Sequence, residues 1–215
     1  MQEGRWPTTS PRCIAVIAAE KNVVTRASMM TVETSRLILR PLTRADAGAV
    51  ARHLGNWNVT RMLALPPWPY RLADAEYYVA RMASRLADDP SITLAMTLKD
   101  HEPMGQPIGI VDIGIQGRLP VLGYWLAEPH WGQGLMTEAV CATVRYAFAT
   151  RPIETIYSGV FYDNPASLAV QKKLGFTVVG ESAVRCMPRN LVVRHIDTEL
   201  TPAAFATASA ESPMR

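Results

Sequence analysis

The sequence predicts a mixed α/β fold with a mostly antiparallel central sheet of about seven strands and flanking helices. Three observations lead to this fold class. The hydrophobic pattern switches repeatedly between the twofold period of strands and the longer period of helices. The elements follow the order strand, two helices, three strands, helix, strand, helix and two strands, which is not a strict alternation. Hydrophobic residues make up 48% and charged residues 19% of the 215 residues, a balance typical of globular proteins.

The first half of the chain contains one strand and two predicted helices. A short apolar run predicts a strand at 36–40. A helix follows at 43–54, with Thr43 as its N-cap and Asp46 at the third helical position. A second helix is predicted at 74–86, because apolar residues recur there at spacings of four.

Three strands and then alternating elements complete the predicted domain. The strand at 92–98 alternates cleanly, whereas the apolar parity of 107–115 shifts at Val111-Asp112, which indicates either a bulge or a strand buried on both faces. The remaining predicted elements are a strand at 121–127, a helix at 135–149, a strand at 153–162, a helix at 165–174 stopped by Gly175, and strands at 176–180 and 192–200.

Composition divides the chain into three parts. Residues 1–30 are expected to be a poorly structured extension, residues 31–202 one domain, and the Ala/Ser-rich residues 203–215 a C-terminal tail. Cys13, Cys141 and Cys186 are odd in number and lack metal-ligand spacing, which argues against a disulfide framework and a structural metal site.

Charge and hydropathy exclude two classes of partner. The formal net charge is only +3, and no Lys/Arg run creates the basic face that nucleic acid requires. No apolar run approaches the ~18–20 residues of a membrane-spanning helix. We therefore expect a cytoplasmic protein, monomeric or homodimeric, with neither nucleic acid nor membrane as its partner.

One glycine-bearing turn predicts an anion site. Residues 121–140 read VLGYWLAEPHWGQGLMTEAV, a strand running into Gly132-Gln133-Gly134 and directly into a helix. The first amides of a helix have no internal partners, and the helix dipole places partial positive charge there. Glycines allow a phosphate to approach the main chain closely. By itself the turn is also compatible with an ordinary strand-to-helix connection, and it lacks the lysine of a Walker loop.

A second segment makes the pattern more specific. Asn164-Pro165-Ala166-Ser167 opens the helix that ends in Lys173-Leu174-Gly175-Phe176. Together, GYWL, WGQGLMTEA, NPAS and KLGF resemble the GNAT superfamily of N-acetyltransferases. Within it, the opening TSRLILRPL and the segment Trp68-Pro69-Tyr70 resemble the RimJ/RimL-type branch of ribosomal-protein alanine acetyltransferases. The resemblance covers residues 31–200 and implies the GNAT-like acyl-CoA N-acyltransferase fold, with acetyl-CoA as co-substrate and no metal.

The resemblance also implies cofactor-binding residues. The pyrophosphate loop would comprise Trp131, Gly132, Gln133, Gly134, Leu135, Met136 and Thr137, with Met136 at a position where Gly or Ala is usual. Leu126 and Ala127 match the strand positions whose main chain pairs with pantetheine, where a backbone N–H would polarise the thioester carbonyl. Asn164 and Ser167 match positions beside the pantetheine arm; local chemistry alone favours helix capping for them, and both roles can hold at once.

The catalytic groups are harder to assign from the sequence. Many superfamily members have a tyrosine seven residues after the Asn, as the acid that protonates the thiolate; here Gln171 occupies that position. Ser167 is our substitute candidate, and the general base is expected to be Glu128 or, less directly, Asp112. The region around residues 55–70 is expected to border the acceptor.

The predicted function is transfer of acetyl from acetyl-CoA to a primary amine, by direct attack in a ternary complex. The acceptor is either a peptide N-terminus, which needs an open groove around residues 55–70, or a small molecule, which needs a closed pocket. The alternative is a coenzyme A-binding module of this family with little or no turnover, favoured by Gln171 and by the lack of an unambiguous base.

Overall fold

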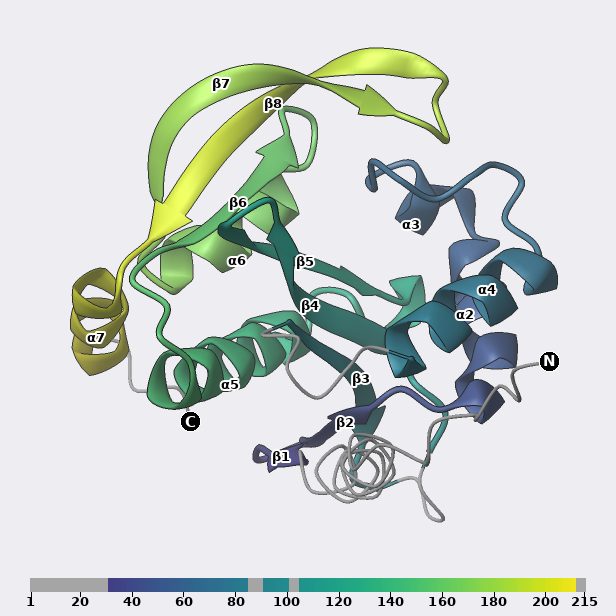
Figure 1. Cartoon of the computed structure of the whole chain (residues 1–215), viewed down its shortest axis with the longest axis horizontal. Coiled ribbons are helices and arrows are strands. Elements are labelled where there is room, and N and C mark those ends of the chain that lie inside the picture. Colours follow the sequence, from purple (N-terminus) through teal and green to yellow (C-terminus); the bar gives the residue numbers. More distant parts are fainter. Residues whose placement is uncertain (1–30, 85–90, 101–104, 212–215) are drawn as a thin grey trace, which may run out of the picture.

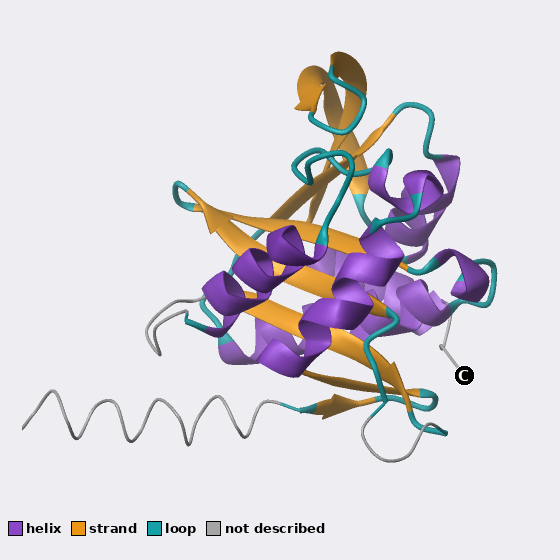
Figure 2. Ribbon diagram, turned by 90° about the vertical axis from the view of Figure 1, so that its right-hand side faces the viewer, coloured by secondary structure: helices purple, strands orange, loops and turns teal. Residues whose placement is uncertain are grey.

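A computed structural model of the chain describes residues 31–84, 91–100 and 105–211. One sheet has the strand order β1-β2-β3-β4-β5-β6-β8-β7, and helices lie on both of its faces (Figures 1 and 2). This confirms the mixed, mostly antiparallel fold class, with eight strands in place of about seven. The strands are β1 (Val32–Glu33), β2 (Leu37–Pro41), β3 (Ile92–Leu98), β4 (Gly109–Gln116), β5 (Leu119–Leu126), β6 (Ile156–Phe161), β7 (Thr177–Cys186) and β8 (Leu191–Leu200).

The helical elements connect these strands. They are η1 (Arg44–Asp46), α2 (Ala47–Leu54), α3 (Trp57–Thr60), α4 (Leu72–Ala83), η2 (Glu128–His130), α5 (Leu135–Thr150), α6 (Pro165–Lys173) and α7 (Pro202–Glu211). The predicted helix start at Thr43 is confirmed, because the Thr43 amide donates to the Asp46 carboxylate at 2.7 Å. The short elements α3 and η2 were not predicted.

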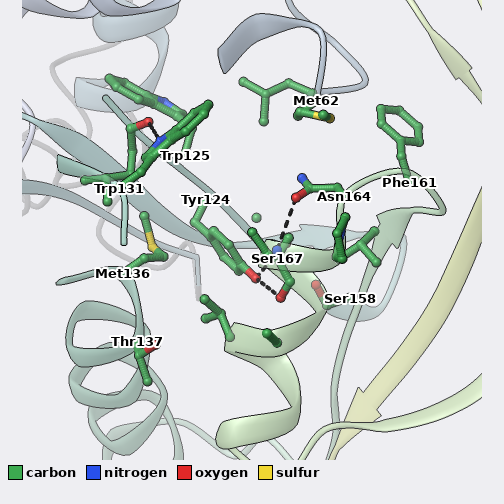
Figure 3. A pocket seen from close by; sticks show the side chains of 18 of the residues that line it. Met62, Tyr124, Trp125, Trp131, Met136, Thr137, Ser158, Phe161, Asn164 and Ser167 are labelled. Atoms are coloured by element: carbon green, nitrogen blue, oxygen red, sulfur yellow. Dashed lines mark hydrogen bonds between the residues drawn. The ribbon is translucent and has the colours of Figure 1, made fainter. Parts of the chain in front are cut away.

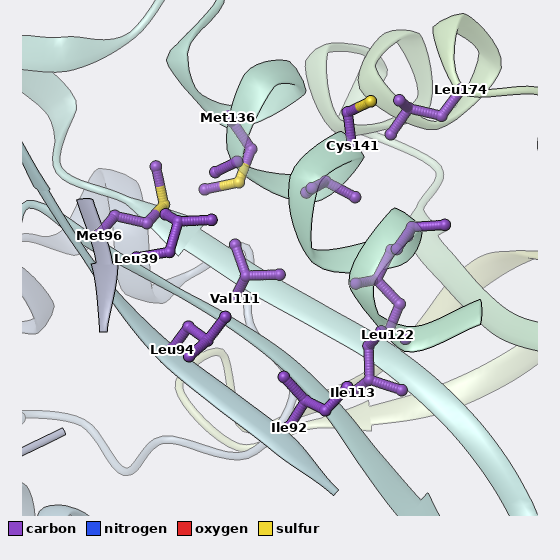
Figure 4. Close-up of a cluster of buried hydrophobic side chains, with 14 of the residues drawn as sticks. Leu39, Ile92, Leu94, Met96, Val111, Ile113, Leu122, Met136, Cys141 and Leu174 are labelled. Atoms are coloured by element: carbon purple, nitrogen blue, oxygen red, sulfur yellow. The ribbon is translucent and has the colours of Figure 1, made fainter. Parts of the chain in front are cut away.

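Two apolar layers hold the sheet between its helices. On one face, α5 packs against leucines, isoleucines and methionines of β2, β3 and β4, as Figure 4 shows for Leu39, Met96, Val111 and Met136. On the other face, α2, α3 and α4 pack against inner residues of β3, β4 and β5, including Trp125. Burial of this kind is the main stabilising contribution to such a domain.

Strand β4 has no bulge. Its pairing with both β3 and β5 runs without a register shift, so the parity change at Val111-Asp112 reflects burial on both faces rather than an inserted residue. The irregularity lies in β7 instead, between Val178 and Gly180. Strand β7 is also six residues longer at its end than the predicted 176–180. Its residues are mostly exposed, so that part had no alternating pattern to reveal it.

The C-terminal tail prediction needs a correction, because residues 202–211 form α7. Phe205 is buried against Phe148 of α5, with ring centroids 6.0 Å apart. The helix approaches Gly175 so closely that a Cβ there would lie 2.7 Å from the Ala204 carbonyl oxygen. The small residues that looked like a weak tail are therefore what allow close packing.

Some predictions fall wholly or partly on residues that the structure does not describe. The extension at 1–30 with Cys13, and the end of the predicted helix at 74–86, lie outside the described residues. Among the described residues, Cys141 and Cys186 are free and buried. That same part of the chain contains no helix with the length and apolar character needed to cross a membrane, and it holds no cluster of three or more side chains suited to a metal ion.

Candidate active site

The sheet divides between β5 and β6. Their register consists of the parallel pair Val121 and Tyr157, and beyond it the two strands separate. A cavity of about 650 Å³ lies at this division and extends to the start of α5, to α6 and to β8. Figure 3 shows the side chains that face it. Parallel strands that part in this way leave main-chain hydrogen-bonding groups without a strand partner, and a bound molecule can use them.

The glycine turn lies at one end of the cavity. Gly132 and Gly134 have φ angles of 74° and 76°, in the left-handed region where a side chain is strained. Helix α5 follows at once, and Gly134 is its N-cap. The amides preceding that of Glu138, which donates to the Gly134 carbonyl, have no acceptor within the helix. The turn therefore provides the anion-binding geometry that the sequence predicts.

The side chain of Arg36, in the turn before β2, holds the glycine turn in place. The Arg36 guanidinium donates to the Gln133 carbonyl at 2.9 Å and forms an ion pair with Glu138 at 2.6 Å. Burial alone would raise the pKa of Glu138. Hydrogen bonds from Thr34, from the Arg36 main chain and side chain, and from Ser35 outweigh it and hold this pKa below its usual value. Glu138 therefore remains ionised at neutral pH and keeps the loop attached to the sheet.

The end of β5 presents one main-chain amide to the gap. Ala127 donates its amide to Ile108 at 2.8 Å and accepts from His130 at 3.0 Å, so its main chain is used within the protein. Because hydrogen-bonding direction alternates along an antiparallel pair, the main chain of Leu126 faces away from β4 and toward the gap. Its carbonyl accepts the Trp131 indole N–H at 2.7 Å. The amide expected to polarise a carbonyl is therefore that of Leu126, not that of Ala127.

Two hydroxyl groups meet in the middle of the cavity. The Tyr124 hydroxyl lies 2.9 Å from the Ser167 hydroxyl and donates to the Ser167 carbonyl oxygen at 3.1 Å (Figure 3). Burial raises the pKa of Tyr124 to about 12, so its phenol is protonated at neutral pH. Asn164 accepts from the Ser167 amide at 3.1 Å, which confirms its capping role on α6. Tyr124 was missed as a site residue, although it lies in the quoted GYWL motif.

Gln171 is structural here. Its side chain is 1% exposed, donates to the Ser158 hydroxyl at 2.9 Å and accepts from the Thr198 hydroxyl at 2.7 Å. Ser158 in turn donates to the Leu122 carbonyl at 3.0 Å. This chain of hydrogen bonds runs from β8 through α6 and β6 to β5, where the strands begin to separate. The Gln171 amide therefore connects these elements where β5 and β6 begin to separate.

The predicted bases lie elsewhere. The Glu128 carboxylate accepts from Asn56 at 2.6 Å and from Asn58 at 2.9 Å, which fixes the start of α3, and it does not line the cavity. Asp112 accepts from the Thr93 hydroxyl and also lies outside the cavity lining. Neither carboxylate is brought together with Ser167.

The β7–β8 hairpin joins the two walls of the cavity. Its tip lies against residues 61–64, which follow α3, in the region where Figure 1 shows the hairpin arching toward that helix. The Met187 amide donates to the Ala64 carbonyl at 2.8 Å, and Arg189 donates to the Arg61 carbonyl at 2.6 Å. Arg189 also forms an ion pair with Asp163 at 2.8 Å. We call these contacts the bridge.

Most of the predicted cofactor residues line the cavity together. They are Leu126, Trp131, Gly132, Gly134, Leu135, Met136, Thr137, Asn164 and Ser167. Ala127 and Gln133 do not line it. Met136 is buried in the apolar layer below α5, so its side chain does not obstruct the turn.

Comparisons with known sequences bear on the family of this chain. Residues 36–177 match the model of the acetyltransferase (GNAT) domain family. The chain is 29% identical over 148 residues to the uncharacterized N-acetyltransferase YoaA of Bacillus subtilis (strain 168), covering 69% of this chain and 83% of that protein.

Solved structures share the fold. Mycobacterium smegmatis RimJ in complex with CoA-disulfide superimposes with a TM-score of 0.68 at 19% identity, covering 81% of this chain and 88% of that one. The ribosomal-protein-S5-alanine acetyltransferase from Vibrio fischeri gives a TM-score of 0.69 at 17% identity, covering 82% and 98%. Because the family model matches more than half of the residues, the chain belongs to the GNAT family of acetyltransferases.

Proposed function

We propose that the protein moves acetyl from acetyl-CoA to a primary amine by direct attack in a ternary complex. The observation that carries this proposal is the continuous cavity between the parted strands. It runs from an anion-binding turn, past a gap-facing amide at Leu126, to a pair of hydroxyl groups. These are the parts that a thioester with a pyrophosphate-bearing handle requires, in the order in which such a molecule presents them.

Each part has a chemical role. The turn from Gly132 to Thr137 would hold the pyrophosphate with main-chain amides. The Leu126 amide would donate to the thioester oxygen as negative charge develops there in the transition state. Tyr124 and Ser167 would protonate the departing thiolate, because the Tyr124 phenol keeps its proton at neutral pH and is in hydrogen-bond contact with the Ser167 hydroxyl.

The bridge bears on the size of the acceptor. Residues 61–64 and the hairpin tip connect the walls on the side where the acceptor must enter. This arrangement favours a small-molecule amine, or the slender end of a peptide, over a folded protein surface that needs an open groove.

The alternative is a coenzyme A-binding module with little turnover. It is favoured by one observation: Gln171 is committed to the buried network and cannot act as an acid. Tyr124 weakens this argument, because its phenol reaches Ser167 of α6 from strand β5.

The test is thiol release from acetyl-CoA with polyamines, amino acids, aminoglycosides and peptides beginning with Ala, Ser or Met. Acetylation of any amine, with a slower rate in Ser167→Ala and Tyr124→Phe but unchanged coenzyme affinity, supports the proposal. Coenzyme binding with no amine-dependent release across the panel would favour the binding module.

A further inference from the structure

We propose that His195, held by Asp197, is the general base that takes a proton from the acceptor amine. This inference rests on the proposed amine acetylation. His195 lies on β8 and lines the cavity, with its side chain 20% exposed. It was not singled out from the sequence, because nothing local distinguishes it. Only the pairing of β8 with β6 brings it to the cavity.

The hydrogen bonds around the ring determine which nitrogen is basic. His195 Nδ1 lies 2.7 Å from Asp197 Oδ1, and the same oxygen accepts from the Ser182 hydroxyl at 2.9 Å. Asp197 is thus an acceptor toward both groups, so the proton of neutral His195 sits on Nδ1. The lone pair is then on Nε2, which is the atom that can accept a proton.

The position of the ring is built by its neighbours on β6. His195 lies opposite Phe161, with ring centroids 5.8 Å apart in an edge-on arrangement. Gly159 makes room for it, since a Cβ at Gly159 would fall 2.1 Å from His195 Cε1. A glycine in the middle of a strand weakens that strand, so its presence here is explained by the space that the imidazole occupies.

Other ionisable groups at the cavity are less suited to this task. Within the described part of the chain, the ionisable side chains that line it are Tyr124, His130, Asp163, Lys173 and His195. Asp163 is paired with Arg189, and Tyr124 carries its proton at neutral pH because burial raises its pKa to about 12. Lys173 is a cation. His130 belongs to η2, beside the glycine turn, on the side assigned to the coenzyme.

The carboxylate in contact with His195 is that of Asp197. His195 is paired with Ser182 on β7 and with Phe161 on β6. The Arg189 guanidinium lies 5.1 Å from the centre of the Phe161 ring, and its charge is balanced by the ion pair with Asp163. The Glu181–Arg194 pair is the remaining charged pair on these strands.

The step balances as follows. An ammonium acceptor gives one proton to His195 Nε2, and the freed nitrogen lone pair attacks the thioester carbon. The C–N bond forms, the C–S bond breaks, and the electron pair leaves with sulfur. As the intermediate collapses, sulfur takes a proton from the hydroxyl pair of Tyr124 and Ser167, and the second proton of nitrogen passes through water to that pair and restores it. His195 then releases its proton to water.

The experiment compares His195→Gln with the wild-type chain across pH, using an amine from the panel above and His53→Gln as a matched control outside the cavity. We expect His195→Gln to lower kcat about 100-fold near neutral pH, with coenzyme affinity by calorimetry unchanged. Above the pKa of the acceptor amine the two rates should converge, because the amine then needs no base. A merely structural role would not give this convergence.

Two results would overturn the inference, and they are distinguishable. A wild-type chain that acetylates no amine refutes the proposed function, and the role of His195 with it. A wild-type chain that is active while His195→Gln keeps its rate and pH profile refutes the role of His195 alone. A constant loss of rate at every pH would also refute it, since that result indicates a positioning role.

Discussion

Replacement of Gln171 by leucine tests whether the buried amide is a structural connector. Leucine has a similar volume, so the main loss is the pair of hydrogen bonds to Ser158 and Thr198, at 2.9 and 2.7 Å. Thr198 is 1% exposed, and its hydroxyl would be left without its acceptor. A buried polar group that loses its partner costs about 1–3 kcal/mol. We therefore expect Gln171→Leu to lower the free energy of unfolding by about 2 kcal/mol.

The assay is urea unfolding followed by circular dichroism, combined with a double-mutant cycle. For a chain of this length, about 2 kcal/mol corresponds to a fall in Tm of roughly 4–8 °C. Thr198→Val alone should cost a similar amount, because it leaves the Gln171 carbonyl oxygen unpaired. The double variant Gln171→Leu/Thr198→Val should cost about 1–2 kcal/mol less than the sum, since it removes both orphaned groups together.

A surface threonine serves as the control. Thr177 is exposed on the edge strand β7, and Thr177→Val should change stability by no more than about 0.5 kcal/mol. Strictly additive losses in the cycle would refute the reasoning, because two groups that satisfy each other must couple. A cost for Gln171→Leu no larger than that of Thr177→Val would refute it as well.

Three further substitutions test the turn and the bridge. Gly134→Asp should weaken coenzyme A binding, measured by calorimetry, by about 100-fold, or about 3 kcal/mol. The control is Gly134→Ala, which adds the backbone strain without the charge. Equal affinity in the two variants would contradict the anion site. Arg189→Ala should lower Tm by several degrees through loss of about 1–3 kcal/mol in the bridge, and more than the exposed Arg185→Ala does. The pKa of Glu138 is below its usual 4.5, so its contact with Arg36 stabilises the fold above that pH and loses this contribution as pH falls through the lowered pKa. Glu138→Gln should remove this part of the acid dependence in unfolding curves, and an unchanged dependence would contradict it.

Much of the fold follows from local patterns. Helix α5 and its turn were predictable, because the glycines and the apolar period occur within one short segment. Helix α6 was predictable for the same reason, through Asn164 and Pro165. Helix α7 was missed although Thr201 precedes Pro202, a helix-start signal, and the Thr201 hydroxyl accepts from the Ala204 amide at 3.3 Å. Its composition suggested a tail, and only the contact with Gly175 explains those small residues.

The candidate site was only partly predictable, because half of it depends on pairing between distant segments. The cofactor turn is contiguous in sequence, and its residues could be named in advance. By contrast, Tyr124 meets Ser167 across 43 positions, and Glu128 meets Asn56 across 72. The functional meaning of a carboxylate or a histidine depends on such partners, which no local pattern specifies. The sequence therefore suggests Glu128 as a base and gives no reason to consider His195.

The attachment of Arg36 to the glycine turn has a consequence for the thermodynamics of ligand capture. The guanidinium reaches from outside the loop to the Gln133 carbonyl and to Glu138 at the start of α5. The turn is therefore preorganised, and an arriving phosphate group meets a rigid receptor rather than a segment that must first be ordered. Less ordering of the turn would then be needed when an anionic ligand binds, which would lower the entropic cost of association.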